Sequence, residues 1–199
     1  MRHMVDLFSG LGGASEAMVL DPKWNVLRIE NNPILRNVPF TYMADVKNVQ
    51  HNVKSNWLVP KLDLIWASPP CREFSLAYGA PAPTAAREGI EFVPDCSLLE
   101  AAIDIIETVK PKYWVIENVV GAIKHFKKYL GEPRQIVGPY VLWGNFPLLP
   151  PGLEVSTKAS KDVNNRNPLR SNLKAKVDFN LSQALKVAIE NQKSIFEYN

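Results

Sequence analysis

A glycine-rich segment at residues 6–13 limits the folds open to this chain, because it joins an apolar run to a predicted helix. The run at residues 4–8 is typical of a buried strand. After a helix that begins at about Ala14, residues 25–30 repeat the apolar pattern. This order of strand, turn, helix and strand predicts an α/β protein with a Rossmann-like fold, in which helices flank a mainly parallel sheet.

The rest of the chain continues the alternation of strands and helices. Apolar runs at residues 62–67 and 113–116 predict two further buried strands. Between them, apolar residues repeat at helical spacing over residues 97–109, which predicts an amphipathic helix. A last helix is expected from about Ser182. With 199 residues, the chain suits one cored domain, since a second would leave too few residues for either core.

Residues 72–95 form a connection of a different kind. Glycines and prolines interrupt any helical or strand periodicity over this stretch. Structureless connections of this length are uncommon in compact domains and are usually functional or disordered. We therefore expect a mobile loop, directly after the predicted strand at residues 62–67.

Composition excludes several classes of protein. Two cysteines cannot build a disulfide framework, and neither has a spacing that would bind zinc, so no metal is expected. No apolar run is long enough for a membrane span or signal peptide, so we expect a soluble, intracellular protein. Residues 110–134 and 158–176 carry a local excess of Lys and Arg. Such segments suit a nucleic-acid backbone, although solvated basic faces explain the charge equally well.

Polar and reactive residues follow three of the predicted strands. Glu30 ends the second strand, two prolines and Cys71 follow the strand at residues 62–67, and Glu117 follows the strand at residues 113–116. Each has an ordinary explanation alone: an exposed acid, a small buried thiol, or a helix cap. Because ligands bind at the carboxyl edge of parallel sheets, their shared position, together with the glycine loop, predicts a functional site.

Three motifs resemble those of the cytosine-5 DNA methyltransferases: residues 6–13 (DLFSGLGG), 68–71 (SPPC) and 117–119 (ENV). The resemblance extends over residues 1–146, and residues 142–146 and 174–190 are similar to short phage-encoded members. It implies the S-adenosylmethionine-dependent methyltransferase fold. It also implies a cytoplasmic enzyme of a prokaryotic cell or a virus-infected host, acting in phage biology or restriction-modification.

The resemblance implies S-adenosylmethionine as cofactor and S-adenosylhomocysteine as product. Phe8 and Asp45 would contact the adenine, and Glu30 would accept hydrogen bonds from the ribose hydroxyls. The complete set of implied cofactor-binding residues is Asp6, Phe8, Ser9, Gly10, Gly12, Gly13, Glu30, Asn31, Asp45 and Pro69.

The chemistry explains why these residue types are needed. Carbon 5 of cytosine is a weak nucleophile, so in the reaction that the resemblance implies the thiolate of Cys71 would first add to carbon 6 and make the ring enamine-like. Glu117 then shares a proton with N3 and holds the exocyclic amine. Arg134 is the nearest match to an arginine that helps hold the target pyrimidine. The base that removes the carbon 5 proton is not identified by the sequence.

The target base must leave the duplex to reach these groups, and we expect residues 72–95 to close over it as a lid. Phe74 and Tyr78 on this loop are expected to contact bases. DNA, double-stranded in this interpretation, is the expected partner, and no membrane is involved. The predicted DNA-binding residues are Arg72, Ser75, Arg87, Asn118, Lys158, Lys161, Arg166 and Arg170.

Two departures from the family pattern keep alternatives open. Arg72 and Glu73 stand where the family has glutamine after its cysteine. Residues 147–177 are too few for a cored recognition domain before the returning segment 178–199. A partner or oligomer could therefore supply sequence preference. RNA as substrate and an inactive cofactor- or nucleic-acid-binding module remain alternatives, and a dehydrogenase is disfavoured because GxGxxG spacing is missing.

Overall fold

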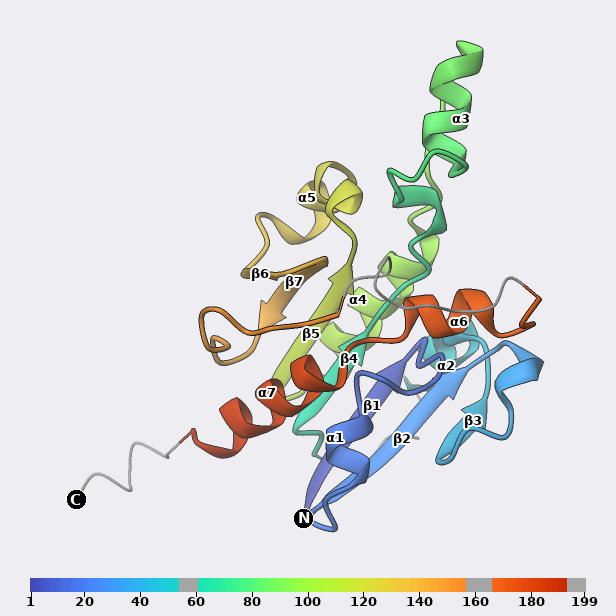
Figure 1. Cartoon of the computed structure of the whole chain (residues 1–199). Coiled ribbons are helices and arrows are strands. Elements are labelled where there is room, and N and C mark those ends of the chain that lie inside the picture. Colours follow the sequence, from blue (N-terminus) through green and yellow to red (C-terminus); the bar gives the residue numbers. More distant parts are fainter. Residues whose placement is uncertain (54–60, 157–165, 193–199) are drawn as a thin grey trace.

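A seven-stranded sheet with strand order β3-β2-β1-β4-β5-β7-β6 forms the centre of the molecule (Figure 1). The structure, a computed structural model, describes residues 1–53, 61–156 and 166–192. The strands are β1 (Arg2–Leu7), β2 (Trp24–Glu30), β3 (Thr41–Met43), β4 (Leu64–Ala67), β5 (Tyr113–Asn118), β6 (Gln135–Val137) and β7 (Tyr140–Asn145). The first five run parallel, β7 is antiparallel to β5, and β6 is antiparallel to β7. The predicted α/β class with a mainly parallel sheet is confirmed.

Helices cover both faces of this sheet. Their buried side chains pack against it in two clusters. The helices are α1 (Glu16–Val19), α2 (Val46–Val53), α3 (Pro81–Glu88), α4 (Ser97–Val109), α5 (Ile123–Leu130), α6 (Arg170–Ala175) and α7 (Phe179–Glu190), with 3-10 turns η1 (Pro33–Leu35), η2 (Arg72–Phe74) and η3 (Val120–Ala122). Side chains of α2, α4 and α5 belong to one cluster, and those of α1 and α7 to the other.

The sequence pattern explains the best-predicted elements. All four residues of β4 are buried, as expected for a central parallel strand. Helix α4 spans the predicted residues 97–109 and buries Leu99, Ala102 and Ile106 against the sheet. Burial of one such large aliphatic side chain contributes about 1.5–3 kcal/mol. At its start, Asp95 Oδ1 accepts a hydrogen bond from the Ser97 N–H at 2.8 Å, which satisfies a free helix donor.

The prediction that residues 72–95 lack regular structure is wrong. They contain η2 and α3, and α3 lies on an arm, residues 75–94, that projects from the body (Figure 1). Pro81 occupies the first turn of α3, where a missing N–H costs no helical hydrogen bond. Gly89, with φ +68°, ends the helix in the left-handed conformation that glycine tolerates.

The last helix packs beside the first one. Helix α7 begins at Phe179, three residues before the predicted start, because Asp178 caps it by accepting the Asn180 N–H at 2.8 Å. Ser182 Oγ donates to the Ala14 carbonyl at 2.7 Å and accepts the Ala17 N–H at 3.1 Å. The described part of the chain has no helix of the length and apolar character needed to cross a membrane.

Candidate active site

A cavity of about 420 Å³ opens at the carboxyl ends of β1, β2, β4 and β5. This edge is where parallel α/β sheets bind ligands. The cavity brings together many of the predicted site residues, although they are distant in sequence. Those that line it are Asp6, Phe8, Ser9, Gly10, Gly13, Glu30, Asn31, Pro69, Cys71, Arg72 and Glu117.

The carboxylate of Glu30 fixes the glycine loop at one wall of the cavity. Its Oε2 accepts the Gly10 N–H at 2.8 Å, and its Oε1 accepts the N–H groups of Asn31 at 3.0 Å and Asn32 at 2.8 Å. Phe8 has φ +58°, a conformation that side chains other than glycine rarely adopt. Such strain is typical of functional sites, where the surroundings hold the backbone in place.

Ser9 carries a buried hydroxyl that suits a polar ligand. Its side chain is 8% exposed and lines the cavity. Within the described residues, its Oγ has no hydrogen-bond partner. A buried hydroxyl without a partner is costly, so a ligand oxygen or nitrogen at this position would be stabilised.

Asp45 lies outside the main cavity, in a hollow directly beside it. The two share Phe8, Glu30 and Asn31 among their lining residues, so they adjoin at the end of β2. Asn31 Nδ2 donates to Asp45 Oδ2 at 3.4 Å. Ala44, Val46 and Leu98 give this hollow an apolar lining. With a volume of about 10 Å³, this hollow has room only for the edge of a flat ring that lies in the main cavity.

Cys71 follows β4 through two prolines and caps the 3-10 turn η2. Asn118, at the end of β5, holds this loop because its Nδ2 donates to the Pro69 carbonyl at 2.9 Å. Its Oδ1 accepts the Val119 N–H at 2.9 Å, and the side chain is 1% exposed. The predicted contact of Asn118 with nucleic acid is therefore corrected: its amide is committed to joining the ends of two strands.

Glu117 on β5 and Cys71 line the same cavity, together with Tyr140 from β7. Tyr140 was missed by the sequence analysis. Burial, with the negative charges of Glu117 and Asp178, raises the pKa of the Tyr140 phenol to about 12. The phenol is therefore a neutral hydrogen-bonding group, and its oxygen accepts the Asp178 N–H at 3.1 Å.

Arg134 does not line the cavity. Its Nε donates to the Phe146 carbonyl at 2.7 Å, and its guanidinium carbon lies 5.5 Å from the centre of the Phe146 ring. The backbone N–H of Arg134 donates to the Leu142 carbonyl at 2.8 Å. This side chain therefore joins β6 to the segment after β7, and the arrangement gives no support to its predicted contact with the pyrimidine.

The arm has a buried root and an exposed end. Phe74 is 4% exposed and packs edge-on against Phe126 at 4.9 Å between ring centres, so its predicted contact with bases is corrected to an anchoring role. Tyr78 is 79% exposed, and the guanidinium carbon of Arg87 lies 3.8 Å from the centre of its ring. Ser75 caps the turn beyond the root, where its Oγ accepts the Ala77 N–H at 3.2 Å.

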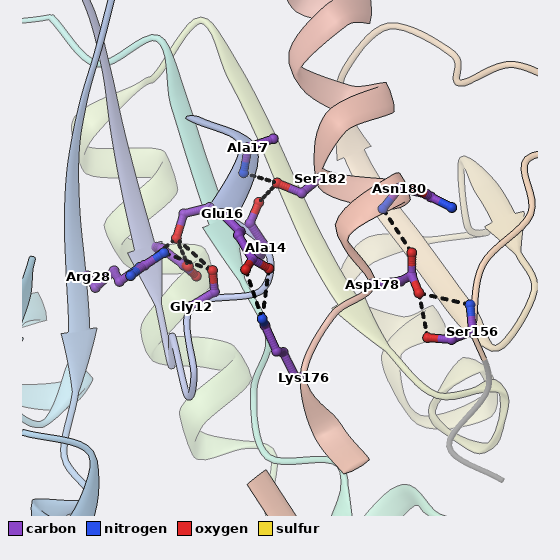
Figure 2. A network of polar contacts seen from close by, with 12 residues as sticks. Gly12, Ala14, Glu16, Ala17, Arg28, Ser156, Lys176, Asp178, Asn180 and Ser182 are labelled. Atoms are coloured by element: carbon purple, nitrogen blue, oxygen red, sulfur yellow. Dashed lines mark hydrogen bonds and ion pairs between the residues drawn. The ribbon is translucent and has the colours of Figure 1, made fainter. Parts of the chain in front are cut away.

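A roof of residues 171–177 was not predicted for the cavity. Residues of α6 and the following segment line it: Ser171, Asn172, Lys174, Ala175, Lys176 and Val177. Lys176 Nζ pairs with Glu16 Oε2 at 2.8 Å (Figure 2). A Cβ on Gly13 would lie 2.3 Å from the Val177 carbonyl oxygen, so the glycine permits this close approach.

Two of the remaining predicted contacts with nucleic acid come directly before this roof in the chain. Arg170 begins α6, and Arg166 lies in the turn before it. Lys158 and Lys161 lie outside the described residues. No group of three or more His, Cys, Asp or Glu side chains suited to a metal ion occurs within residues 1–53, 61–156 and 166–192.

Gly12 faces away from the cavity, toward a buried polar network that the sequence analysis also missed. Its carbonyl accepts a hydrogen bond from Arg28 (Figure 2). Arg28 also donates to Ser15, and Ser15 donates to Asp6. The contact of Gly12 with a cofactor stays a prediction, and the structure adds the contact of Gly12 with Arg28. An arginine inside an otherwise apolar strand run was the available signal, since buried charges require partners.

Comparison with known proteins identifies relatives of the chain. The model of a family described as C-5 cytosine-specific DNA methylase matches residues 2–134. The type II methyltransferase M.MspI of a Moraxella species is 28% identical over 121 residues, 61% of this chain and 27% of that protein. The "Probable DNA (cytosine-5)-methyltransferase" of Frog virus 3 (isolate Goorha) is 28% identical over 154 residues, 71% of this chain and 65% of that protein.

The alignments therefore span less than two thirds of the length of both relatives. Among solved structures, the Entamoeba histolytica methyltransferase EhMeth matches with a TM-score of 0.48 and 17% identity, over 84% of this chain and 61% of that chain.

Proposed function

Because this chain belongs to the C-5 cytosine-specific DNA methylases, we propose that it transfers a methyl group from S-adenosylmethionine to carbon 5 of cytosine in DNA. One observation carries the proposal: Cys71, Glu117 and the glycine loop line a single cavity. A nucleophile, an acid and a cofactor loop at one sheet edge are the parts that this reaction needs.

The residues around the cavity fit the cofactor. Phe8 and the apolar hollow beside Asp45 suit the edge of an adenine ring, and Glu30 suits ribose hydroxyls. The unpaired hydroxyl of Ser9 suits a polar group of the amino-acid part. When bound, S-adenosylmethionine supplies an electrophilic methyl group on its sulfonium. The chain's own residues orient this group and exclude water from it.

Cys71 forms the bond that activates the base. Its thiolate adds to carbon 6 of cytosine, the π electrons of the carbon 5–carbon 6 double bond shift to the carbon 4–carbon 5 bond, and those of the carbon 4–N3 double bond shift to N3. Glu117 donates or shares a proton at N3, which keeps negative charge from accumulating there. After carbon 5 accepts the methyl group, a base removes the carbon 5 proton and the Cys71 sulfur leaves, which restores the aromatic ring.

The arm and the roof are the surfaces that we assign to DNA. A cytosine inside a duplex cannot reach Cys71, so the base must leave the stack. The arm carries the exposed pair Tyr78 and Arg87, which suits contacts with bases and phosphates. Arg170 and Lys174 extend the basic surface along α6. Residues 147–177, alone or with a partner or second copy, would supply any sequence preference.

A covalent trapping experiment tests the proposal. The protein is incubated with tritiated S-adenosylmethionine and duplex DNA that contains 5-fluorocytosine, in which fluorine blocks the final elimination. We expect a labelled adduct that survives denaturation, is lost in Cys71→Ser and is retained in Cys96→Ser, the matched control on the other cysteine. A parallel incubation uses RNA that contains 5-fluorocytosine. An adduct with this RNA and none with DNA would show that RNA is the substrate. No adduct with either nucleic acid, in protein that binds S-adenosylhomocysteine, would indicate a binding module.

A further inference from the structure

Arg28 is a buried cation beneath the glycine loop. It lies on β2, is 4% exposed, and donates three hydrogen bonds. Its Nε reaches Ser15 Oγ at 2.8 Å, its Nη2 the Gly12 carbonyl at 2.9 Å, and its Nη1 the Pro39 carbonyl at 3.0 Å. The planar guanidinium fork therefore joins the glycine loop to the chain that enters β3.

The network continues from Ser15 to Asp6. Ser15 Oγ donates to Asp6 Oδ2 at 2.6 Å, and Ser15 is fully buried. Burial raises the pKa of the Asp6 carboxyl to about 6, while the Ser15 hydrogen bond and the positive charge of Arg28 oppose that rise. Burial lowers the pKa of the Arg28 guanidinium, and the charge of Asp6 opposes this shift. Each buried group thus makes the charged form of the other less costly.

Gly12 makes room for the guanidinium. A Cβ at this position would lie 2.2 Å from Arg28 Cζ, closer than any real contact, and Gly12 has φ +73°. Any other residue would displace Arg28 and strain the loop. The glycine at residue 12 and the arginine at residue 28 are therefore one structural unit.

Two side chains of β2 hold the loop from the same face of the sheet. Residues two apart on a strand point to the same side, so Arg28 and Glu30 share a face. Glu30 accepts the Gly10 N–H at 2.8 Å, and Arg28 donates to the Gly12 carbonyl at 2.9 Å. The loop is thus fixed through the N–H of Gly10 and the carbonyl of Gly12. Of the two β2 side chains that hold it, only Glu30 lines the cavity.

We propose that Arg28 is a positioning residue of the cofactor site, which holds residues 9–13 in the conformation that S-adenosylmethionine binds. The assignment of these residues to the cofactor rests on the function proposed above. Arg28 acts through the loop and touches neither the cofactor nor the target base. Its loss should therefore weaken cofactor binding without slowing the chemistry at Cys71 and Glu117.

The test compares Arg28→Met and Arg28→Lys with the wild type. Arg36→Met is the matched control, because Arg36 is exposed and its Nε bonds only locally, to the Pro33 carbonyl at 3.0 Å. We expect Arg28→Met to raise the dissociation constant for S-adenosylhomocysteine about tenfold by calorimetry, as loss of a charge-assisted hydrogen bond implies. KM for S-adenosylmethionine should rise equally with kcat retained, and Arg28→Lys should restore binding in part.

Hydrogen exchange of the ligand-free proteins separates this proposal from the function proposed above. Faster exchange confined to residues 8–17 in Arg28→Met supports the part of the proposal in which Arg28 holds the loop. If the wild type binds no S-adenosylhomocysteine, the proposed function fails and only this effect on the loop remains. Unchanged exchange in these residues overturns the positioning role. If Arg28→Met does not fold, Ser15→Ala decides: it keeps Arg28 but removes the link to Asp6, and should raise loop exchange about threefold.

Discussion

Glu73 Oε2 accepts a hydrogen bond from the backbone N–H of Asp95 at 2.6 Å, so the two ends of the arm are joined at its root. Asp95 also binds Ser97, the first residue of α4, whose N–H and hydroxyl donate to Asp95 Oδ1 and Oδ2 at 2.8 and 2.9 Å. The segment after Cys71 is thereby tied to a helix of the core. Glu73 is one of the two residues that depart from the family pattern after the nucleophile.

Replacing Glu73 tests whether this tie positions the nucleophile. Glu73→Ala should lower kcat about tenfold, because loss of the hydrogen bond lets the segment after Cys71 move. Its KM for S-adenosylmethionine should stay unchanged, since the glycine loop is untouched. Glu88→Ala on α3 is the control, with an exposed acid on the same arm. Equal kcat in both variants would show that the tie has no catalytic consequence.

Ser182 connects the last helix to the glycine loop and α1. Ser182→Ala removes the hydrogen bonds to the Ala14 carbonyl and the Ala17 N–H, and leaves both buried groups without this partner. The free energy of unfolding should fall by about 2 kcal/mol in urea titrations. Gln183→Ala, at an exposed position of the same helix, should change it by less than about 0.5 kcal/mol. An equal fall in the free energy of unfolding in both variants would show that the hydrogen bonds of Ser182 do not stabilise the fold.

Asp6 should make the stability of the protein depend on pH. Its pKa is raised from the ordinary 3.8 to about 6, so between these values the folded state holds a proton that the unfolded chain has released. Stability from this group is therefore highest below pH 3.8 and falls as pH rises to about 6. Asp6→Asn lacks this fall. In urea titrations, the free energy of unfolding of the variant relative to the wild type should rise from pH 4.5 to pH 7. The same difference at both pH values would contradict the raised pKa of Asp6.

Gly13 and Gly79 form a matched pair for testing the roof. A Cβ at Gly13 would meet the Val177 carbonyl oxygen at 2.3 Å, whereas a Cβ at Gly79 would meet nothing within 4 Å. Gly13→Ala should push the roof from the loop, lowering the free energy of unfolding by about 1–3 kcal/mol and weakening S-adenosylhomocysteine binding. Gly79→Ala should preserve both. Normal binding by Gly13→Ala would exclude the roof from the cofactor site.

The elements that the sequence predicts best are those whose signal is local. Strand β4 and helix α4 follow from apolar runs of the right period, and their polar neighbours mark the sheet edge. Helix α3 was missed because Pro81 is unfavourable within a helix but acceptable in its first turn. Periodicity alone does not distinguish these two cases.

The missed parts of the site depend on contacts between distant residues. Arg28 reads as one polar position in a strand, and its partners Ser15 and Gly12 become neighbours only when β2 pairs with β1. The roof at residues 171–177 meets the glycine loop from the other end of the chain. Asn118 resembles a surface residue in the sequence, yet its amide is enclosed by the strand ends that it joins.

The hydrogen bonds of Ser182 span 165 and 168 residues of sequence. A chain emerging from the ribosome therefore makes its glycine loop early but lacks this anchor until residue 182 has been synthesised. Contacts of such long sequence separation close slowly, because the intervening chain must first be ordered. The capacity to bind a nucleoside cofactor should consequently appear as one of the last events of folding.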